Sequence, residues 1–168
     1  VQYSVSTGQE EGCIALVNLV SDNDANRVSI DAKLGIDGIV SAMATHTNVS
    51  KVQEHGCAAL GNLASNNDAN RVSIAAKHGI EAIVSAMTAH SNVSKVQDHG
   101  CVSLANLAWN NDANRVSIAA NDGIEAIVSA MTAYWNIPVV QEWGCLALGY
   151  LSFNDAICIS FSSTFCID

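Results

Sequence analysis

Residues 50–93 read SKVQEHGCAALGNLASNNDANRVSIAAKHGIEAIVSAMTAHSNV and contain the unit that most of the 168-residue chain repeats. Its Gly-Cys pair recurs at a constant spacing of 44 residues, at 12–13, 56–57, 100–101 and 144–145. Its Asn-Arg-Val-Ser-Ile segment recurs at 26–30, 70–74 and 114–118. A fixed period of this length is typical of a stacked repeat protein.

The first part of the unit predicts a helix over residues 51–65. Apolar or small residues form one stripe there at helical spacing: Val52, Gly56, Leu60 and Leu63. A glycine inside a helix costs about 1 kcal/mol relative to alanine. The return of Gly56 in every unit therefore indicates that a neighbouring helix crosses close to it.

Two more helices follow in the same unit. The Asn-Asn-Asp segment 66–68 offers side-chain oxygens to cap a short helix, which carries Arg71, Val72, Ile74 and Ala75. We expect Gly79 to end this helix, because glycine readily takes the left-handed conformation found after helix C-termini. A third apolar stripe begins at once, with Ile80, Ile83, Val84 and Met87.

Three helices per unit, one of them short, resemble the armadillo repeat. Segment 67–84 resembles armadillo helices one and two, and 52–64 resembles helix three of the neighbouring frame. The resemblance implies an all-α fold, a right-handed superhelical α-solenoid with period 44, as a single domain over residues 1–168. It divides the chain into the third helix of an incomplete repeat, three full repeats and a degenerate C-terminal segment: 1–21, 22–65, 66–109, 110–153 and 154–168.

Charge excludes several classes of partner. Seven Lys and Arg against 16 Asp and Glu give a formal net charge of −9, and no basic cluster interrupts this background. Nucleic acids and anionic membranes are bound through basic patches, so we expect neither as a partner. A basic peptide or a basic protein surface is compatible with the charge. No apolar run approaches the roughly 18 residues of a membrane span.

The sequence carries none of the common enzyme motifs. It contains no glycine-rich phosphate loop, no Gly-x-Ser-x-Gly and no His-Glu-x-x-His. Its polar residues are duplicated along the repeats, whereas catalysis requires one convergent set. We therefore predict no catalytic residue, no metal site and no cofactor.

The cysteines and histidines are interpreted as structural. Four cysteines lie one period apart, and stacked repeats hold equivalent residues about 10 Å from each other, too far for a disulfide. We interpret these four as small buried side chains, which leaves Cys158 and Cys166 as the only plausible pair. The histidines are interpreted as part of a solvated helix surface: His46, His55, His78, His90 and His99.

Positions at which the units differ are candidates for function. On the predicted third helix these include residues 14, 58, 102 and 146, then 17, 61, 105 and 149, and then 21, 65, 109 and 153. The first and last sets, together with residues 18, 62, 106 and 150, form one helical face apart from the buried leucine stripe.

In peptide-binding armadillo proteins such as importin alpha, this face lines a concave groove with a Trp-x-x-x-Asn pattern. By that resemblance, Asn18, Asn62 and Asn106 are the asparagines that bond a peptide's main chain, a task that suits an amide. The tryptophan positions hold Ile14, Ala58, Val102 and Leu146 instead, so we do not expect the pockets that grip long basic side chains. An asparagine that bridges neighbouring repeats would recur equally regularly, and both interpretations stay open.

Aromatic residues gather in the last third of the chain. Three fall on the predicted groove: Trp109, Tyr150 and Phe153. Three others are candidates for a second contact surface: Tyr134, Trp135 and Trp143. Aromatic side chains are typical binding hot spots, but they suit equally the covering of the stack's end or contact with a second copy.

The sequence thus predicts a non-enzymatic scaffold that binds a polypeptide along the groove. The candidate binding residues are Asn18, Asn62, Asn106, Val102, Trp109, Leu146, Tyr150 and Phe153. The alternative is a structural protein whose open repeat ends stack into homo-oligomers or filaments. The cysteine pattern fits a reducing compartment, so we expect an intracellular, cytoplasmic location.

Overall fold

A computed structural model of the chain describes residues 8, 11–12 and 35–153. Over 35–153 the elements are α3 (Gly35–Thr45), α4 (Ser50–Ala64), α5 (Asp68–Ala76), α6 (Gly79–Ala89), α7 (Ser94–Ala108), α8 (Asp112–Ala120), α9 (Gly123–Ala133) and α10 (Pro138–Leu151). No strand occurs in these ranges, which confirms the all-α prediction.

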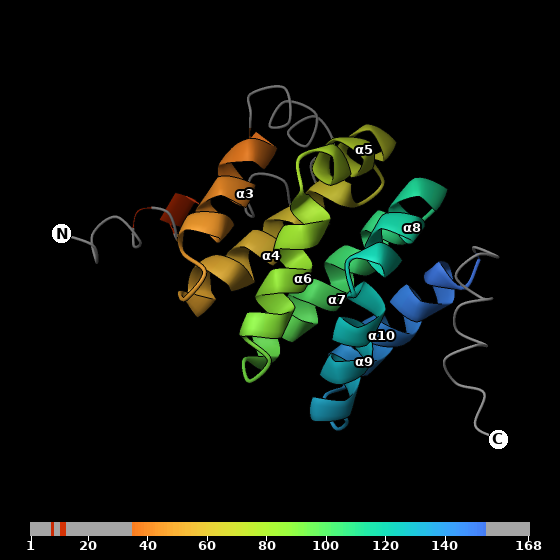
Figure 1. Ribbon diagram of the computed structural model, residues 1–168. Helices are drawn as coiled ribbons and strands as arrows, with labels where there is room; N and C mark the ends of the chain where they lie inside the picture. Colours follow the sequence, from red (N-terminus) through yellow and green to blue (C-terminus); the bar gives the residue numbers. More distant parts are fainter. Residues whose placement is uncertain (1–7, 9–10, 13–34, 154–168) are drawn as a thin grey trace, which may run out of the picture.

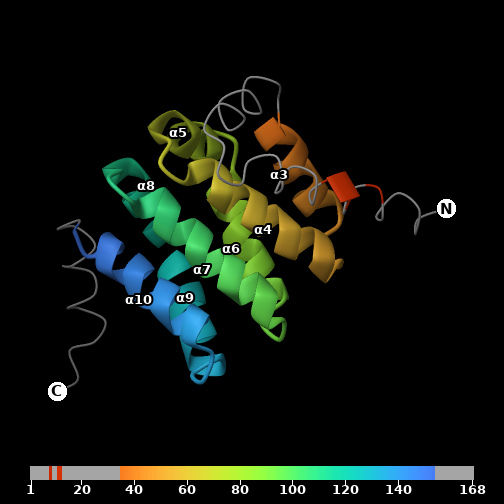
Figure 2. The ribbon, with the colours of Figure 1, turned by 180° about the vertical axis from the view of Figure 1, so that it is seen from behind.

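Helices of one kind lie side by side. The second helices of the repeats, α3, α6 and α9, form one row, with the short α5 and α8 near one edge (Figure 1). The third helices, α4, α7 and α10, form the other row (Figure 2). Within each row successive helices begin 44 residues apart, as at 50, 94 and 138. The handedness of the superhelix and the repeat boundaries stay predictions.

The short first helix of each repeat begins at a side-chain cap. Asn67 Oδ1 accepts a hydrogen bond of 3.0 Å from the backbone N–H of Asn70 at the start of α5. Asn111 accepts the same bond from Asn114 at the start of α8. The cap predicted within 66–68 is therefore confirmed, because this local pattern satisfies a backbone donor that the helix leaves open.

The prediction of a left-handed Gly79 is wrong. The left-handed residue is His78, with a φ of 62°, and its counterpart one repeat later is Asp122, with a φ of 59°. Gly79 instead begins α6, and a glycine is required there because a side chain would clash with Ile74. A Cβ built on it would lie 2.4 Å from Cγ2 of Ile74 and 2.9 Å from the Ile74 carbonyl oxygen.

Close packing at Gly56 is confirmed. A Cβ there would lie 2.5 Å from Cγ of Met43, which belongs to the neighbouring helix α3. The contact recurs at the same distance between Gly100 and Met87 and between Gly144 and Met131. Each glycine thus admits a methionine side chain of the preceding second helix, so its role is packing.

A glutamine, buried in α4 and α7 and half-buried in α10, ties each third helix to the second helix before it. The side-chain nitrogen Nε2 of Gln53 donates to the carbonyls of Met43 and His46, at 2.9 Å each. Gln97 and Gln141 make the equivalent pairs of bonds. The His46 carbonyl and its counterparts also accept a backbone hydrogen bond, as from the Val49 N–H at 2.9 Å. The glutamine bonds hold the two rows of helices in a fixed relation.

Candidate functional site

The first and last sets of variable positions, with residues 62, 106 and 150, include no buried residue among those described, and we call this surface of the third helices the third-helix face. The other variable set is not part of it, because Gly61 and Ala105 are buried. Its described members are Ala58, Asn62, Ser65, Val102, Asn106, Trp109, Leu146, Tyr150 and Phe153. Trp109 is 49% exposed and Phe153 73%, and the other members are half-buried. Four predicted positions lie outside the described residues: Ile14, Val17, Asn18 and Ser21.

Across α7 and α10, and beside the segment between α4 and α5, the face hollows into a cavity of about 270 Å³. Its lining is Ser65, Asn66, Arg71, Asn106, Trp109, Trp143, Leu146 and Tyr150. The rings of Trp109 and Tyr150 meet edge to face, with centroids 4.8 Å apart and planes at 63°. The structure thus brings four residues of the predicted groove into one cavity, Asn106, Trp109, Leu146 and Tyr150, together with Trp143 from the predicted second contact surface.

Asn106 bridges two repeats. Its Nδ2 donates a hydrogen bond of 3.0 Å to the Gly61 carbonyl on α4, so the bridging interpretation is confirmed for this residue. The bond uses one amide hydrogen and leaves Oδ1 without a partner among the described residues. Asn62, one repeat earlier, is also engaged in an interaction. Binding of a peptide main chain by either asparagine stays a prediction.

The third helices approach closely beneath this face. Ser103 Oγ lies 2.7 Å from both the Cys57 carbonyl of α4 and the His99 carbonyl of its own helix. A Cβ built on Gly61 would lie 2.6 Å from this hydroxyl oxygen and 3.3 Å from the Ser103 Cα. The absence of a side chain at Gly61 therefore sets the spacing of α4 and α7.

The cysteines of the repeat differ along the stack. Cys57 and Cys101 are buried, and burial raises the pKa of each thiol to about 12. Cys145 is exposed, so the prediction of a buried side chain is wrong there. The physical reason is its position on α10, which no later third helix covers among the described residues. Three other cysteines lie outside those residues: Cys13, Cys158 and Cys166.

The interpretation of the histidines as solvated is wrong for His90. Its side chain is buried, and Nε2 donates a hydrogen bond of 2.7 Å to the Thr47 carbonyl of the preceding repeat. His99 is half-buried. Burial, helped by Lys95, lowers its pKa below the ordinary value of 6.5, against the opposing effect of Asp98. The remaining histidines are half-buried or exposed: His46, His55 and His78.

The three residues predicted to form a second contact surface have separate surroundings. Tyr134 occupies the position equivalent to His90 and donates a hydrogen bond of 3.1 Å from its hydroxyl to the Ser91 carbonyl. Trp135 is 76% exposed after α9. Trp143 instead lines the cavity on the third-helix face. Sequence reasoning missed this place for Trp143, although its spacing of three residues from Leu146 and seven from Tyr150, about one and two helical turns, was an available signal.

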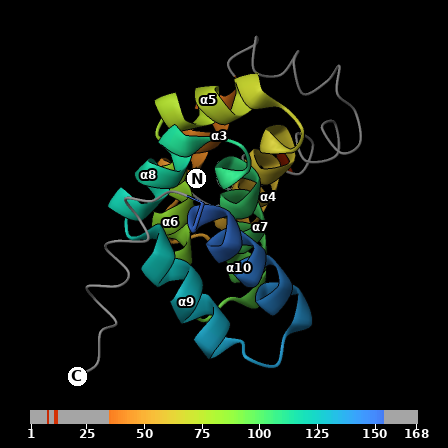
Figure 3. The same cartoon turned by 90° about the vertical axis from the view of Figure 1, so that its right-hand side faces the viewer.

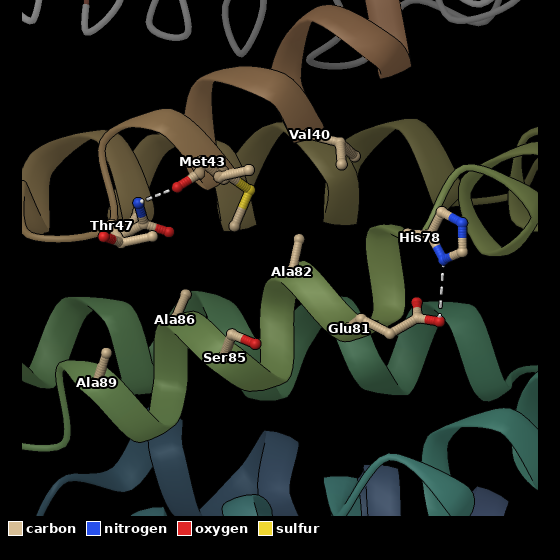
Figure 4. A pocket seen from close by; sticks show the side chains of 11 residues that line it. Val40, Met43, Thr47, His78, Glu81, Ala82, Ser85, Ala86 and Ala89 are labelled. Carbon is tan, nitrogen blue, oxygen red and sulfur yellow. Dashed lines mark hydrogen bonds and ion pairs between the residues drawn. The ribbon is translucent and has the colours of Figure 1, made fainter.

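Two further cavities lie on the other row of helices. One, of about 380 Å³, separates α3 from α6 and is lined largely by small and apolar side chains, with His78 and Glu81 paired at 3.3 Å (Figure 4). The other, of about 550 Å³, lies between α6 and α9 and has residues at equivalent positions. Because they recur with the repeat, we attribute both to the spacing of second helices.

The described residues contain neither a group of metal-ligating side chains nor a membrane-spanning helix. Residues 8, 11–12 and 35–153 contain no group of three or more His, Cys, Asp or Glu side chains placed to hold a metal ion. None of the helices in that part of the chain is long and apolar enough to cross a membrane.

Comparison with known proteins agrees with this architecture. The family described as LRRK2 ARM repeat matches residues 12–160. None of the curated proteins matches the chain.

Three crystal structures titled as engineered proteins of the Northeast Structural Genomics Consortium share the fold, each with 28% sequence identity. One has a TM-score of 0.75, over 86% of this chain and 56% of that one. Another has 0.80, over 92% and 36%, and a third 0.76, over 85% and 57%. The chain therefore spans little more than half, or less, of each of these proteins.

Proposed function

We propose, on the premise that this chain belongs to the armadillo-type family of LRRK2 ARM repeats, that it is a non-enzymatic scaffold that binds a polypeptide along the third-helix face. The observation that carries the proposal is the aromatic cavity over α7 and α10, which Asn106, Trp109 and Tyr150 help to line. Large, partly exposed aromatic rings around a hollow are typical of the anchors that dominate binding energy.

The chemistry of the face suits an extended chain. Asn106 Oδ1 is an acceptor available for a main-chain N–H, and the rings of Trp109 and Tyr150 offer apolar area to a side chain. The net charge of −9 favours a basic partner. The proposal therefore assigns recognition of the main chain to the asparagine and anchoring to the aromatic residues.

An array of short peptides of varied charge, probed with the labelled chain, tests this proposal. We expect preferential binding of basic peptides and a loss of about tenfold or more in affinity for Trp109→Ala, as for a hot-spot residue. The matched control is Val116→Ala, an apolar residue on α8 that is 49% exposed, as Trp109 is, and that does not line the cavity; it should change affinity little. Equal binding by Trp109→Ala and the wild type would overturn the proposal.

An intracellular location forms part of this proposal. Cys57, Cys101 and Cys145 are free thiols, and free thiols are typical of reducing compartments. Microscopy of the tagged chain in cells checks it, and accumulation in an oxidising compartment would contradict it.

A second candidate function is end-to-end association, and the exposure of the last repeat favours it. Figure 3 views the stack from the side of α9 and α10. Val128 is 39% exposed where Val84, its counterpart, is 7% exposed, and Cys145 is exposed where Cys101 is fully buried. The end of the stack thus presents side chains that earlier repeats bury, as a non-closing contact requires.

Sedimentation over a range of concentrations tests association. A Gly149→Arg variant should remain monomeric, because a neighbouring helix would meet the new side chain, whereas nothing lies within 4 Å of a Cβ at Gly149 in the single chain. Labelling of Cys145 with a thiol reagent should slow as the wild-type chain associates. A wild-type chain that is monomeric at every concentration would remove this candidate.

A further inference from the structure

The cavity over α7 and α10 has two walls of different chemistry. Ser65 and Asn66 follow α4, and Arg71 belongs to α5, so one wall is polar. The other wall belongs to α10 and is aromatic and apolar: Trp143, Leu146 and Tyr150. Helix α7 lies between α4 and α10 (Figure 2), so the two walls face each other across its end. A side chain that enters the cavity therefore meets polar groups on one side and rings on the other.

The size of the cavity restricts its occupant to a single side chain. Its volume of about 270 Å³ is below the roughly 300–1,000 Å³ of pockets that hold drug-sized ligands. The rings of Trp109 and Tyr150 already meet edge to face, and aromatic rings gain energy from such contacts beyond the area that they bury. An aromatic side chain therefore suits the α10 wall.

The charge of the lining disfavours a basic side chain, although the whole chain is acidic. None of the described residues that line the cavity is Asp or Glu. Arg71 does line it, with its side chain 4% exposed, Nη1 bonded to the Ala64 carbonyl and Nη2 paired with Asp68. A lysine or arginine buried in the cavity would meet a guanidinium and no carboxylate of the lining, which is unfavourable. We therefore expect the basic residues of the partner to lie outside the cavity.

The polar wall requires a group that accepts hydrogen bonds. The guanidinium of Arg71 only donates, whereas the Ser65 hydroxyl and the Asn66 amide donate and accept. A phenol hydroxyl also does both, but an indole N–H only donates and a phenyl ring does neither. A carboxylate accepts, yet its burial against the rings of α10 is costly and the net charge of −9 opposes it. Tyrosine is thus the side chain that suits both walls.

We propose that this cavity binds one tyrosine side chain of the partner polypeptide, with the ring against the α10 wall and the hydroxyl against the polar wall. The inference rests on the proposed function, because it names the anchor residue of the bound polypeptide. It agrees with the main-chain contact proposed for Asn106, which lines the same cavity between the two walls.

The tryptophans of the chain report on the site. Trp109 and Trp143 line the cavity, whereas Trp135 does not and is 76% exposed. Titration of the isotope-labelled full chain with N-acetyl-tyrosinamide, followed by NMR, should shift the indole N–H signals of Trp109 and Trp143 and leave that of Trp135 in place. We expect a dissociation constant on the order of 1 mM for a ligand of this size. The phenylalanine amide should bind about fivefold more weakly, because it lacks one hydrogen bond, and the tryptophan, lysine and glutamate amides should bind no better than that.

Two variants locate the binding site. Ser65→Trp introduces the residue that the next repeat carries at the equivalent position, Trp109, and should abolish binding of the tyrosine amide by filling the cavity. Val116→Trp is the matched control, because Val116 is exposed on α8 and does not line the cavity, and it should retain binding. Circular dichroism checks that both variants keep the fold.

Several results would overturn the inference: equal affinity for the tyrosine and phenylalanine amides, a lysine amide that binds as tightly as the tyrosine amide, retained binding by a folded Ser65→Trp, or no shift of the Trp109 and Trp143 signals at about 10 mM ligand. The peptide array fails or succeeds separately. Binding of basic peptides that depends on Trp109 but shows no preference for tyrosine would leave the proposed function standing and remove this inference alone.

Discussion

Two successive stretches of the third-helix face share a scaffold and differ in lining. Between α4 and α7 the equivalent positions hold Asn62, Ser65, His99, Val102 and Asn106. Between α7 and α10, 44 residues later, they hold Asn106, Trp109, Trp143, Leu146 and Tyr150. The first stretch holds no Trp or Tyr, whereas three of the five positions of the second stretch hold one, although both rest on the same backbone arrangement.

The residues beneath the two stretches explain how the lining can change. Each third helix carries a glycine that admits a methionine of the second helix, and a glutamine that bonds two carbonyls of that helix. These contacts are nearly identical in distance from repeat to repeat. The glycine and glutamine positions thus fix the packing of the helices, and the residues of the exposed third-helix face can differ between repeats.

The largest difference expected between the two stretches concerns their glycines. A Cβ on Gly61 would meet Ser103, including its backbone Cα at 3.3 Å, whereas nothing lies within 4 Å of a Cβ on Gly149. We expect Gly61→Ala to lower the free energy of unfolding by about 2 kcal/mol through overpacking. Gly149→Ala should raise it by up to about 1 kcal/mol through helix propensity. Urea unfolding followed by circular dichroism measures both, and equal shifts would contradict the packing described at Gly61.

A smaller effect separates Asn106 from its counterpart Tyr150. Asn106 bonds the Gly61 carbonyl across the repeat boundary, so Asn106→Ala should cost about 1 kcal/mol of stability. The Tyr150 hydroxyl makes no hydrogen bond with the described residues, and Tyr150→Phe should be close to neutral. Urea unfolding of Asn106→Ala and Tyr150→Phe measures both changes in the free energy of unfolding. A neutral Asn106→Ala would remove its bridging role.

The smallest effect is a pH dependence of stability that arises from His99 in the first stretch. The pKa of His99 is lowered in the folded chain, chiefly by burial. The unfolded chain then binds the proton more readily, so this contribution to stability is complete above pH 6.5 and is lost as pH falls through the folded pKa. His99→Gln should reduce the loss of stability between neutral and mildly acidic pH. If His99→Gln and the wild type had the same pH profile of the melting temperature, a group other than His99 would be responsible for the pH dependence.

Local patterns were predictable from the sequence, and contacts between repeats were not. The Asn67 cap depends on residues three apart, and the third-helix stripe depends on helical spacing alone. The left-handed His78 was not predictable, because Gly79 is reserved by its contact with Ile74. The bond from Asn106 to Gly61 requires the relative position of two helices 44 residues apart, which no single-helix pattern contains.

Errors at the end of the stack have a related cause. Cys145 and Trp143 occupy positions that earlier repeats fill with the buried Cys101 and the half-buried His99. Their exposure and neighbours depend on whether another helix follows, which periodicity does not reveal. Gln53 was overlooked because a buried glutamine has no local signal except its return at 97 and 141.

We claim that binding resides where the repeats differ. Replacing the aromatic residues of the second stretch with their counterparts from the first tests this most directly. The variant Trp109→Ser, Trp143→His and Tyr150→Asn gives the second stretch the residues that the first stretch already carries at these positions, so the scaffold should tolerate it. We predict an unchanged helical circular dichroism spectrum and a loss of about tenfold or more in affinity for the peptides that the wild type selects from the array. The same peptides bound with the same affinity would contradict the claim that function resides where the repeats differ.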